Sequence, residues 1–412
     1  MADALASGAS VRKDVGVQVP PRARISKTEK RQDMLPEDIK VRNFNREKLK
    51  FQVGTPIAIW ATSRLIVLVS WCVSTGFVKS AGLKESFLRW DGGWYFSIVV
   101  DGYSNQRGVG ATNIAFFPGF PLLSRALSYV PFFSEYRATV VITLLMGMIA
   151  VCLFHLLAMQ ILVDKEQATF ATMLFAFTPG SVVFSMFYSE GLFIALSIAC
   201  LYFLIRKRFM AAAIFTCLAG TVRPSAIVLI AVLYMSVFID CRHNFKIKKL
   251  LPLSIAPIGM LGYGAYLQQH VGSVSAYFET QSAGWGEKFS LTARVNDFGQ
   301  FFTWATNGFG AADWNKVVPG AMTLLVVLAL IGCWRLKPPI EVVVFAIGIL
   351  GMSFFSSTLG FRPRFVMTAF PLFLGLSAIL RTSVQRQIAV SLSVASLSLY
   401  SMIVLQLLYQ TP

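Results

Sequence analysis

The chain has 412 residues, of which 55% are hydrophobic and only 14% are charged. A soluble protein of this length carries roughly a quarter charged residues, so this composition excludes an ordinary water-soluble domain. The formal net charge of +17 raises the question of nucleic acid, but the basic residues lie in the N-terminal segment and in short loops between apolar runs. This placement is typical of the cytosolic loops of membrane proteins, and we expect no nucleic-acid binding.

The first fifty residues are polar, with twelve Lys or Arg against seven Asp or Glu. This composition predicts a disordered, basic cytosolic tail over residues 1–50 that touches anionic lipid. Residues 51–412 contain repeated apolar runs of membrane-spanning length, and we predict that they form an all-α, polytopic helical membrane domain.

The apolar windows predict eleven transmembrane helices, at residues 53–78, 138–163, 168–187, 190–205, 209–222, 224–240, 250–268, 317–334, 340–358, 364–380 and 387–408. With the tail in the cytosol, alternation of the spans puts the Lys- and Arg-rich loops on the cytosolic side. The loops 79–137 and 269–316 then share the opposite face. Within the first of these loops, segments 115–123 and 129–133 are apolar but broken by proline, and we expect interfacial helices there.

The first loop contains the motif Arg89-Trp90-Asp91-Gly92-Gly93-Trp94-Tyr95. A carboxylate at a membrane surface costs free energy unless it is paired or used, so Asp91 is a candidate for chemistry. Trp90, Trp94 and Tyr95 place flat rings beside it, as in sites that hold a sugar or a lipid headgroup. The alternative for Asp91 is a helix cap or an ion pair with Arg89.

Three arginines stand at helix breaks on the same face, against the usual charge bias of membrane proteins. Arg223 precedes Pro224, and Arg362 and Arg364 flank Pro363. A guanidinium in such a place either reaches the lipid headgroups or clamps a phosphate, and we treat all three as candidate phosphate ligands.

Further polar groups on this face are Tyr188 and Glu190, at a tight turn, and Gln281 and Trp285, in the second long loop. Glu190 has a structural alternative, because a glutamate near a helix N-terminus is stabilised by the helix dipole. The sequence shows no phosphate-binding glycine loop, dinucleotide fingerprint or zinc-ligand spacing, so we expect neither a cofactor nor a metal.

The motif at 89–95, followed by Asp101-Gly102-Tyr103 and the segment 115–121, resembles the first lumenal loop of the PIG-V family, which comprises GPI mannosyltransferase 2 and bacterial relatives. The resemblance continues in order as far as residue 385. It implies a GT-C-like glycosyltransferase that moves mannose from a polyprenyl (dolichyl-type) phosphate to a lipid-linked or glycan acceptor on the non-cytosolic face. The key first-loop aspartate of the family corresponds to Asp91. Some relatives carry an acidic residue where this chain has Asn113.

We therefore predict that Asp91 is the general base and that Arg364, Arg223 and Arg362 bind the donor phosphate, in an inverting reaction without metal. A carboxylate sealed by a guanidinium, with no opening to bilayer or solvent, would contradict this role. The predicted substrate-binding residues are Arg89, Trp90, Trp94, Tyr95, Asn113, Tyr188, Glu190, Gln281 and Trp285.

Two other classes stay open. Broken helices also mark secondary transporters, although no internal repeat is visible, and in a non-catalytic scaffold Asp91 would only anchor a loop. For the enzyme, the sequence favours a bacterial plasma membrane, with an ER enzyme that adds the second mannose to GPI precursors as the alternative. A small membrane partner subunit is also left open.

Overall fold

The computed structural model describes residues 46–76, 82–106, 110–162, 164–243, 245, 247–308 and 314–407. The chain divides into two compact units, Met1–Leu49 and Lys50–Pro412, and every predicted site residue belongs to the second. Most of the predicted tail, residues 1–45, lies outside the described residues. Its last five residues already belong to the first helix.

The described residues of the second unit form helices and no strand, which confirms the all-α fold class. Within the described part of the chain, one antiparallel bridge joins Phe289 and Ser356. The helical elements are α1 (Arg46–Thr75), α2 (Leu83–Phe87), α3 (Asp91–Val100), η2 (Asn113–Ala115), α4 (Gly119–Ser128), α5 (Glu135–Ile161), α6 (Lys165–Ala176), η3 (Pro179–Ser185), α7 (Glu190–Ile205), α8 (Phe209–Gly220), α9 (Ala226–His243), η4 (Ile247–Leu250), α10 (Leu251–Ile255), α11 (Ile258–Val271), α12 (Ala276–Trp285), α13 (Ala293–Asn307), α14 (Trp314–Leu336), α15 (Ile340–Phe355), α16 (Pro363–Thr368), α17 (Pro371–Ile379), α18 (Ser383–Met402) and a π-helical turn η5 (Ile403–Leu407).

Four described helices are long and apolar enough to cross a membrane, in α1, α5, α14 and α18. Two bent pairs, α6 with η3 (71°) and α10 with α11 (41°), raise this to six if each pair is one span. The chain is thus a polytopic membrane protein, and each of the eleven predicted segments coincides with a helix or a broken helix. Several of these helices are shorter than a bilayer requires, such as α7 and α15 with 16 residues each, so helix length supports fewer than eleven spans.

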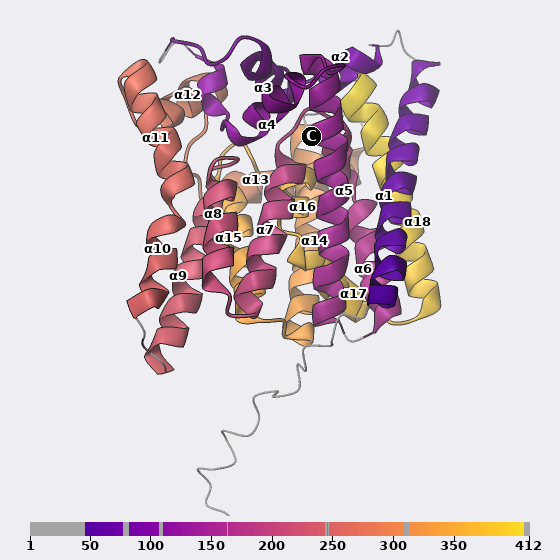
Figure 1. The fold of residues 1–412 in the computed structure, drawn as a ribbon. Helices are drawn as coiled ribbons and strands as arrows, with labels where there is room; N and C mark the ends of the chain where they lie inside the picture. Colours follow the sequence, from indigo (N-terminus) through magenta and orange to yellow (C-terminus); the bar gives the residue numbers. More distant parts are fainter. Residues whose placement is uncertain are drawn as a thin grey trace, which may run out of the picture. The chain divides into compact units, whose positions relative to one another are not determined.

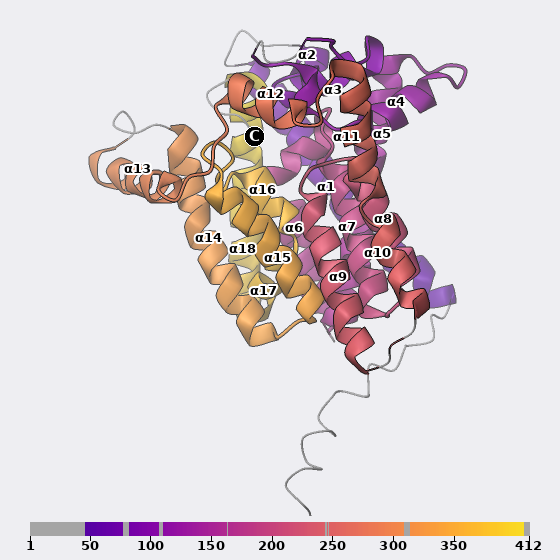
Figure 2. The ribbon, with the colours of Figure 1, turned by 90° about the vertical axis from the view of Figure 1, so that its left-hand side faces the viewer.

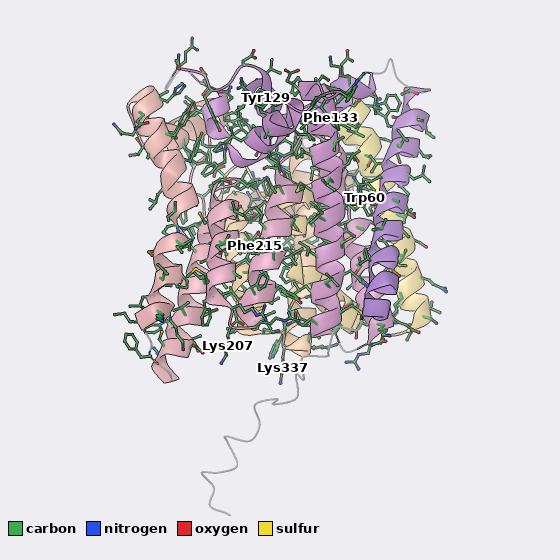
Figure 3. All side chains as sticks on the ribbon, viewed as in Figure 1. Trp60, Tyr129, Phe133, Lys207, Phe215 and Lys337 are labelled. Atoms are coloured by element: carbon green, nitrogen blue, oxygen red, sulfur yellow. The ribbon has the colours of Figure 1, made fainter. Side chains whose placement is uncertain are left out.

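The two ends of the second unit differ in character. Figure 1 shows α2, α3, α4 and α12 gathered at one end, and the same grouping is visible after a quarter turn in Figure 2, where α13 extends sideways next to α14. Lys207 and Lys337, in two of the short basic loops, lie at the opposite end from Tyr129 and Phe133 (Figure 3). The predicted segregation of basic loops from the long first loop is therefore present in the fold.

Only part of the first long loop exposes apolar surface. In α4, Phe120 is fully buried whereas Leu122 is 59% exposed, and the turn that follows exposes Phe132 almost completely. Segment 129–133, predicted as an interfacial helix, is a turn and not a helix, because Pro131 interrupts it; its exposed apolar side chains still suit the membrane interface. The segment around Phe116 and Phe117 instead belongs to the packed interior, because it lies between α3 and α12.

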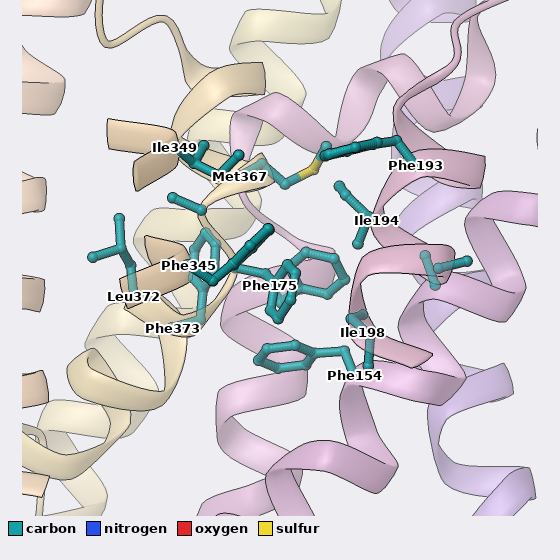
Figure 4. Close-up of a cluster of buried hydrophobic side chains, with 14 of the residues drawn as sticks. Phe154, Phe175, Phe193, Ile194, Ile198, Phe345, Ile349, Met367, Leu372 and Phe373 are labelled. Atoms are coloured by element: carbon teal, nitrogen blue, oxygen red, sulfur yellow. The ribbon is translucent and has the colours of Figure 1, made fainter. Parts of the chain in front are cut away.

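A buried aromatic cluster packs against the first turns of α7 and α16. Phe154 of α5 stacks on Phe175 of α6 with ring centroids 4.5 Å apart, and Phe345 packs against Phe370 at 5.0 Å. Figure 4 shows Met367 of α16 and Phe193 of α7 entering the same cluster. The first turns of α7 and α16 are therefore anchored by dense apolar packing.

The half-helix η3 comes unusually close to the start of α16. A Cβ atom at Gly180 would lie 2.2 Å from the carbonyl oxygen of Pro363, so only glycine permits this contact. The contact places η3 and the turn after it against Arg364.

Candidate functional site

Asp91 is the first residue of α3, and the local backbone forces it there. The preceding Trp90 has a φ of 57°, a left-handed conformation that bulky residues rarely adopt. A Cβ at Gly92 would lie 2.6 Å from the carbonyl oxygen of Phe87, so the glycine allows the chain to fold tightly back on itself. The turn places the carboxylate at a helix N-terminus, where the helix dipole favours negative charge.

Two carboxylates and two guanidiniums meet in what we call the charge row: Asp91, Arg364, Glu190 and Arg223. Oδ2 of Asp91 lies 2.5 Å from Nη1 of Arg364, and the same nitrogen lies 3.8 Å from Oε1 of Glu190. That Oε1 lies 2.6 Å from Nη1 of Arg223. The four residues come from α3, α16, α7 and the turn after α8, so the fold collects four separate predicted positions into one site. Asp91 pairs with Arg364 and not with Arg89.

Exposure differs along the charge row. The side chain of Asp91 is 24% exposed and that of Arg223 is 14% exposed, whereas Arg364 retains 9% and Glu190 none. Asp91 is thus reachable from outside although one of its oxygens is held by Arg364. Glu190, a predicted substrate-binding residue, is fully buried and lies beside Arg223 and Arg364; its contact with substrate stays a prediction.

A hydroxyl network fixes the charge row to the surrounding helices. The backbone N–H of Asp91 donates to the hydroxyl of Tyr188 at 3.2 Å. Nη1 of Arg223 donates to Oγ of Ser189 at 3.3 Å, and Ser189 shares a 2.6 Å hydrogen bond with the hydroxyl of Tyr95. Tyr95 and Tyr188 therefore serve as supports of the charged groups.

The local electrostatics keep the site cationic. Burial lowers the pKa of Arg223, but attraction to the Glu190 carboxylate, together with the smaller effects of Tyr95 and of the hydrogen bond to Glu190, raises the pKa above its ordinary value. Burial, followed by repulsion from Arg364, lowers the pKa of Arg362, which also lies within electrostatic range of Asp91. With Arg362 within electrostatic range, three guanidiniums and two carboxylates lie in this region, and their charges sum to +1.

Aromatic side chains extend from the charge row to α12. Tyr95 contacts Phe116 with ring centroids 5.0 Å apart, and Trp94 meets Trp285 at 6.0 Å. Gln281 donates from Nε2 to the carbonyl oxygen of Ala115 at 3.3 Å. Trp94, Trp285 and Gln281 are thus brought together near the charge row, and their role as substrate ligands stays a prediction.

Three predicted residues stand apart from the charge row. The amide of Asn113 accepts from the N–H of Ser104 and donates to Ser97 and to the carbonyl of Gly102, so three of its four possible hydrogen bonds hold the loop. The indole N–H of Trp90 points to the carbonyl of Val404 at 3.4 Å. Nη1 of Arg89 is buried without a hydrogen-bond partner among the described residues.

Two residues at the site were not among the predicted ones. Phe365 lies 4.6 Å from the guanidinium of Arg364 and 5.9 Å from that of Arg223, and it supports both by cation–π contact. Ser189 links Arg223 to Tyr95. Their position in the chain, each adjacent to a predicted residue, was the only available signal.

A surface groove of about 550 Å³ lies elsewhere, between α6 and α18, and none of its lining residues belongs to the predicted site. It is lined by Phe170, Met173 and Arg386 among others. We place the functional site at the charge row because the groove brings together no comparable set of charged groups.

Comparisons with known proteins identify a single family. The family model of the mannosyltransferases (PIG-V) matches residues 46–259, more than half of the chain. The matched segment includes Asp91, Glu190 and Arg223 and ends before Arg364.

Curated relatives are similar at low identity. GPI alpha-1,6-mannosyltransferase 2 of Cricetulus griseus is 28% identical over 210 residues, which is 45% of this chain and 42% of that protein. The Mus musculus protein of the same name is 30% identical over 170 residues (39% and 33%), and the Homo sapiens protein is 27% identical over 219 residues (47% and 43%). The match thus spans less than half the length of these relatives.

Proposed function

Because the chain belongs to the mannosyltransferase (PIG-V) family, we propose that it transfers mannose from a polyprenyl (dolichyl-type) phosphate donor to a hydroxyl group of a lipid-linked or glycan acceptor. The reaction takes place at the charge row, at the end of the bundle that carries α3 and α12 (Figure 1). We assign this end to the non-cytosolic side of the membrane.

In the proposed reaction, the acceptor oxygen attacks the anomeric carbon from the side opposite the phosphate. The acceptor C–O bond forms while the bond from the anomeric carbon to the phosphate oxygen breaks, and the electron pair leaves on the phosphate. The acceptor proton passes to Asp91. Arg364 and Arg223, with Arg362 nearby, stabilise the charge that develops on the leaving phosphate. A single displacement of this kind inverts the anomeric centre.

One observation carries this proposal: an accessible carboxylate at a helix N-terminus lies 2.5 Å from a buried arginine in a cluster with net positive charge. A base and an anion-binding group are thus adjacent, as required when an alcohol attacks a sugar phosphate. A phosphate leaves without being protonated, so a second catalytic carboxylate is unnecessary, unlike in glycoside hydrolysis.

The names of the relatives supply a second candidate for the acceptor. Those proteins are GPI alpha-1,6-mannosyltransferases, so a GPI precursor in an ER membrane is the specific alternative to a bacterial lipid-linked acceptor. Mass spectrometry of lipid-linked and surface glycans from cells lacking this protein distinguishes the two. Loss of the second mannose of GPI supports the ER enzyme, and loss of another mannosylated lipid supports the bacterial one.

The direct test is the variant Asp91→Asn, assayed in membranes with polyprenyl-phosphate-mannose. Loss of the base is expected to reduce turnover by about 10²-fold or more, while the amide leaves the shape of the site unchanged. Glu135→Gln, which neutralises an exposed carboxylate at the start of α5, is the matched control and is expected to retain activity. Normal turnover by Asp91→Asn would refute the assignment. Solute uptake by reconstituted protein, without glycosyl transfer, would favour a transporter instead.

A further inference from the structure

We propose that Glu190 is a positioning residue that shares Arg364 with Asp91, so that Arg364 can turn to the donor phosphate and uncover the base only when the donor is bound. This inference rests on the proposed function, because it concerns the same reaction. It gives a role to a carboxylate that has no exposed surface.

The geometry supports a shared guanidinium. Nη1 of Arg364 lies 2.5 Å from Asp91 and 3.8 Å from Glu190, so a modest rotation changes its principal partner. Oε2 of Glu190 is buried and has no hydrogen-bond partner among the described residues, and it can therefore accept from Arg364 after the rotation. The rings of Phe365 and Tyr188 lie 4.6 and 5.3 Å from the guanidinium, and such contacts tolerate rotation within its plane.

The charges support an exchange driven by the donor. With Arg362 included, the site carries one net positive charge, and a sugar phosphodiester carries one negative charge. Bound donor therefore neutralises the site, and its phosphate competes with Asp91 for Arg364. When the bond to the sugar breaks, the product is a phosphate monoester with a charge of about −1.5 to −2. The arginines that Glu190 holds in place stabilise this added charge.

Removal of the Glu190 charge has two opposite consequences. The site becomes more positive and Arg223 loses its carboxylate partner, so the donor phosphate binds more tightly. Arg364 is then left with Asp91 as its only carboxylate, so the base stays covered and the chemical step slows. A lower KM for the donor together with a lower kcat is a signature that a loss of folded protein does not produce.

The experiment compares wild type with Glu190→Gln and Glu190→Asp in nanodiscs. Donor KM and kcat are measured with polyprenyl-phosphate-mannose, and affinity is measured separately with farnesyl phosphate, which carries no sugar. For Glu190→Gln we expect a kcat about tenfold or more below wild type, with a several-fold lower donor KM and tighter farnesyl phosphate binding. Glu190→Asp retains the charge, and we expect its KM to stay near the wild-type value.

The matched control is Asp297→Asn, which breaks another buried ion pair, to Arg294 at 2.6 Å, outside the charge row. It tests destabilisation alone and is expected to leave the affinity for farnesyl phosphate unchanged. Unchanged or weaker phosphate binding by Glu190→Gln, with an active wild type, overturns the inference and leaves the proposed function standing. Tighter binding by Glu190→Gln without mannosyl transfer by the wild type overturns the proposed function and leaves the anion site standing.

Discussion

Tyr188 and Phe365 show how single residues tune the site. The hydroxyl of Tyr188 accepts the backbone N–H of Asp91, and its ring lies 5.3 Å from the guanidinium of Arg364. It therefore holds both members of the principal ion pair. Phe365, next in sequence to Arg364, covers that guanidinium and the one of Arg223. Aromatic rings thus lie against the guanidinium groups of both arginines. The N–H groups at the guanidinium edges are then available to bind carboxylates and, in the proposed reaction, a phosphate.

Arg364→Lys tests the importance of guanidinium shape. Lysine retains the charge but lacks the planar fork that bonds two partners at once. The loss of one charged hydrogen bond costs about 1.5–3 kcal/mol, which lowers kcat/KM by about tenfold to a hundredfold. Arg335→Lys, at an exposed position at the end of α14, is the control and should behave as wild type. Equal activity of Arg364→Lys and wild type would show that charge alone suffices.

At the scale of helices, α1 is attached to the rest of the unit by polar contacts as well as by the apolar packing of Ile59 and Val67. Arg64, in the middle of this span, donates to Oγ of Ser185 at 2.7 Å and to Oγ of Ser181 at 3.0 Å. Ser70 shares a 2.6 Å hydrogen bond with Ser398 of α18. Arg64 therefore ties α1 to η3, the half-helix that leads into Tyr188 and Glu190.

We expect Arg64→Lys to be more destabilising than Arg64→Met. Lysine keeps a charge within the span but cannot reach both serines, whereas methionine removes the charge together with its hydrogen bonds. The expected loss for Arg64→Lys is about 1–3 kcal/mol, measured as a lower midpoint of thermal unfolding in detergent. If methionine proved the more harmful of the two, the charge that lysine retains would itself contribute to stability, and the prediction would be wrong.

At the scale of the whole second unit, the candidate site and the basic loops lie at opposite ends. The charge row stands near the end that carries α3 and α12, and Lys207 and Lys337 lie at the other end (Figure 3). In the proposed orientation the basic loops lie in the cytosol, and the proposed lipid-linked donor would approach the charge row from the opposite leaflet.

An epitope inserted after Lys207 or Lys337 should therefore be reached by antibody only after the membrane is permeabilised. An epitope inserted after Tyr129, which is 76% exposed, should be reached in sealed right-side-out vesicles. Expression and glycosyl transfer by each insertion variant confirm that it folds. Accessibility of all three epitopes from one side would refute the proposed orientation.

The order of residues along the chain was enough to predict an all-α membrane protein, the family resemblance and the four charged residues that the structure brings together. Long apolar runs determine helices in a bilayer, and a motif such as Arg89-Trp90-Asp91 is a property of neighbouring residues. Only the tertiary structure paired Asp91 with Arg364, which lies 273 residues further along the chain, and buried Glu190 completely. Pairing and burial depend on which helices pack together, and that packing is a property of the folded chain as a whole.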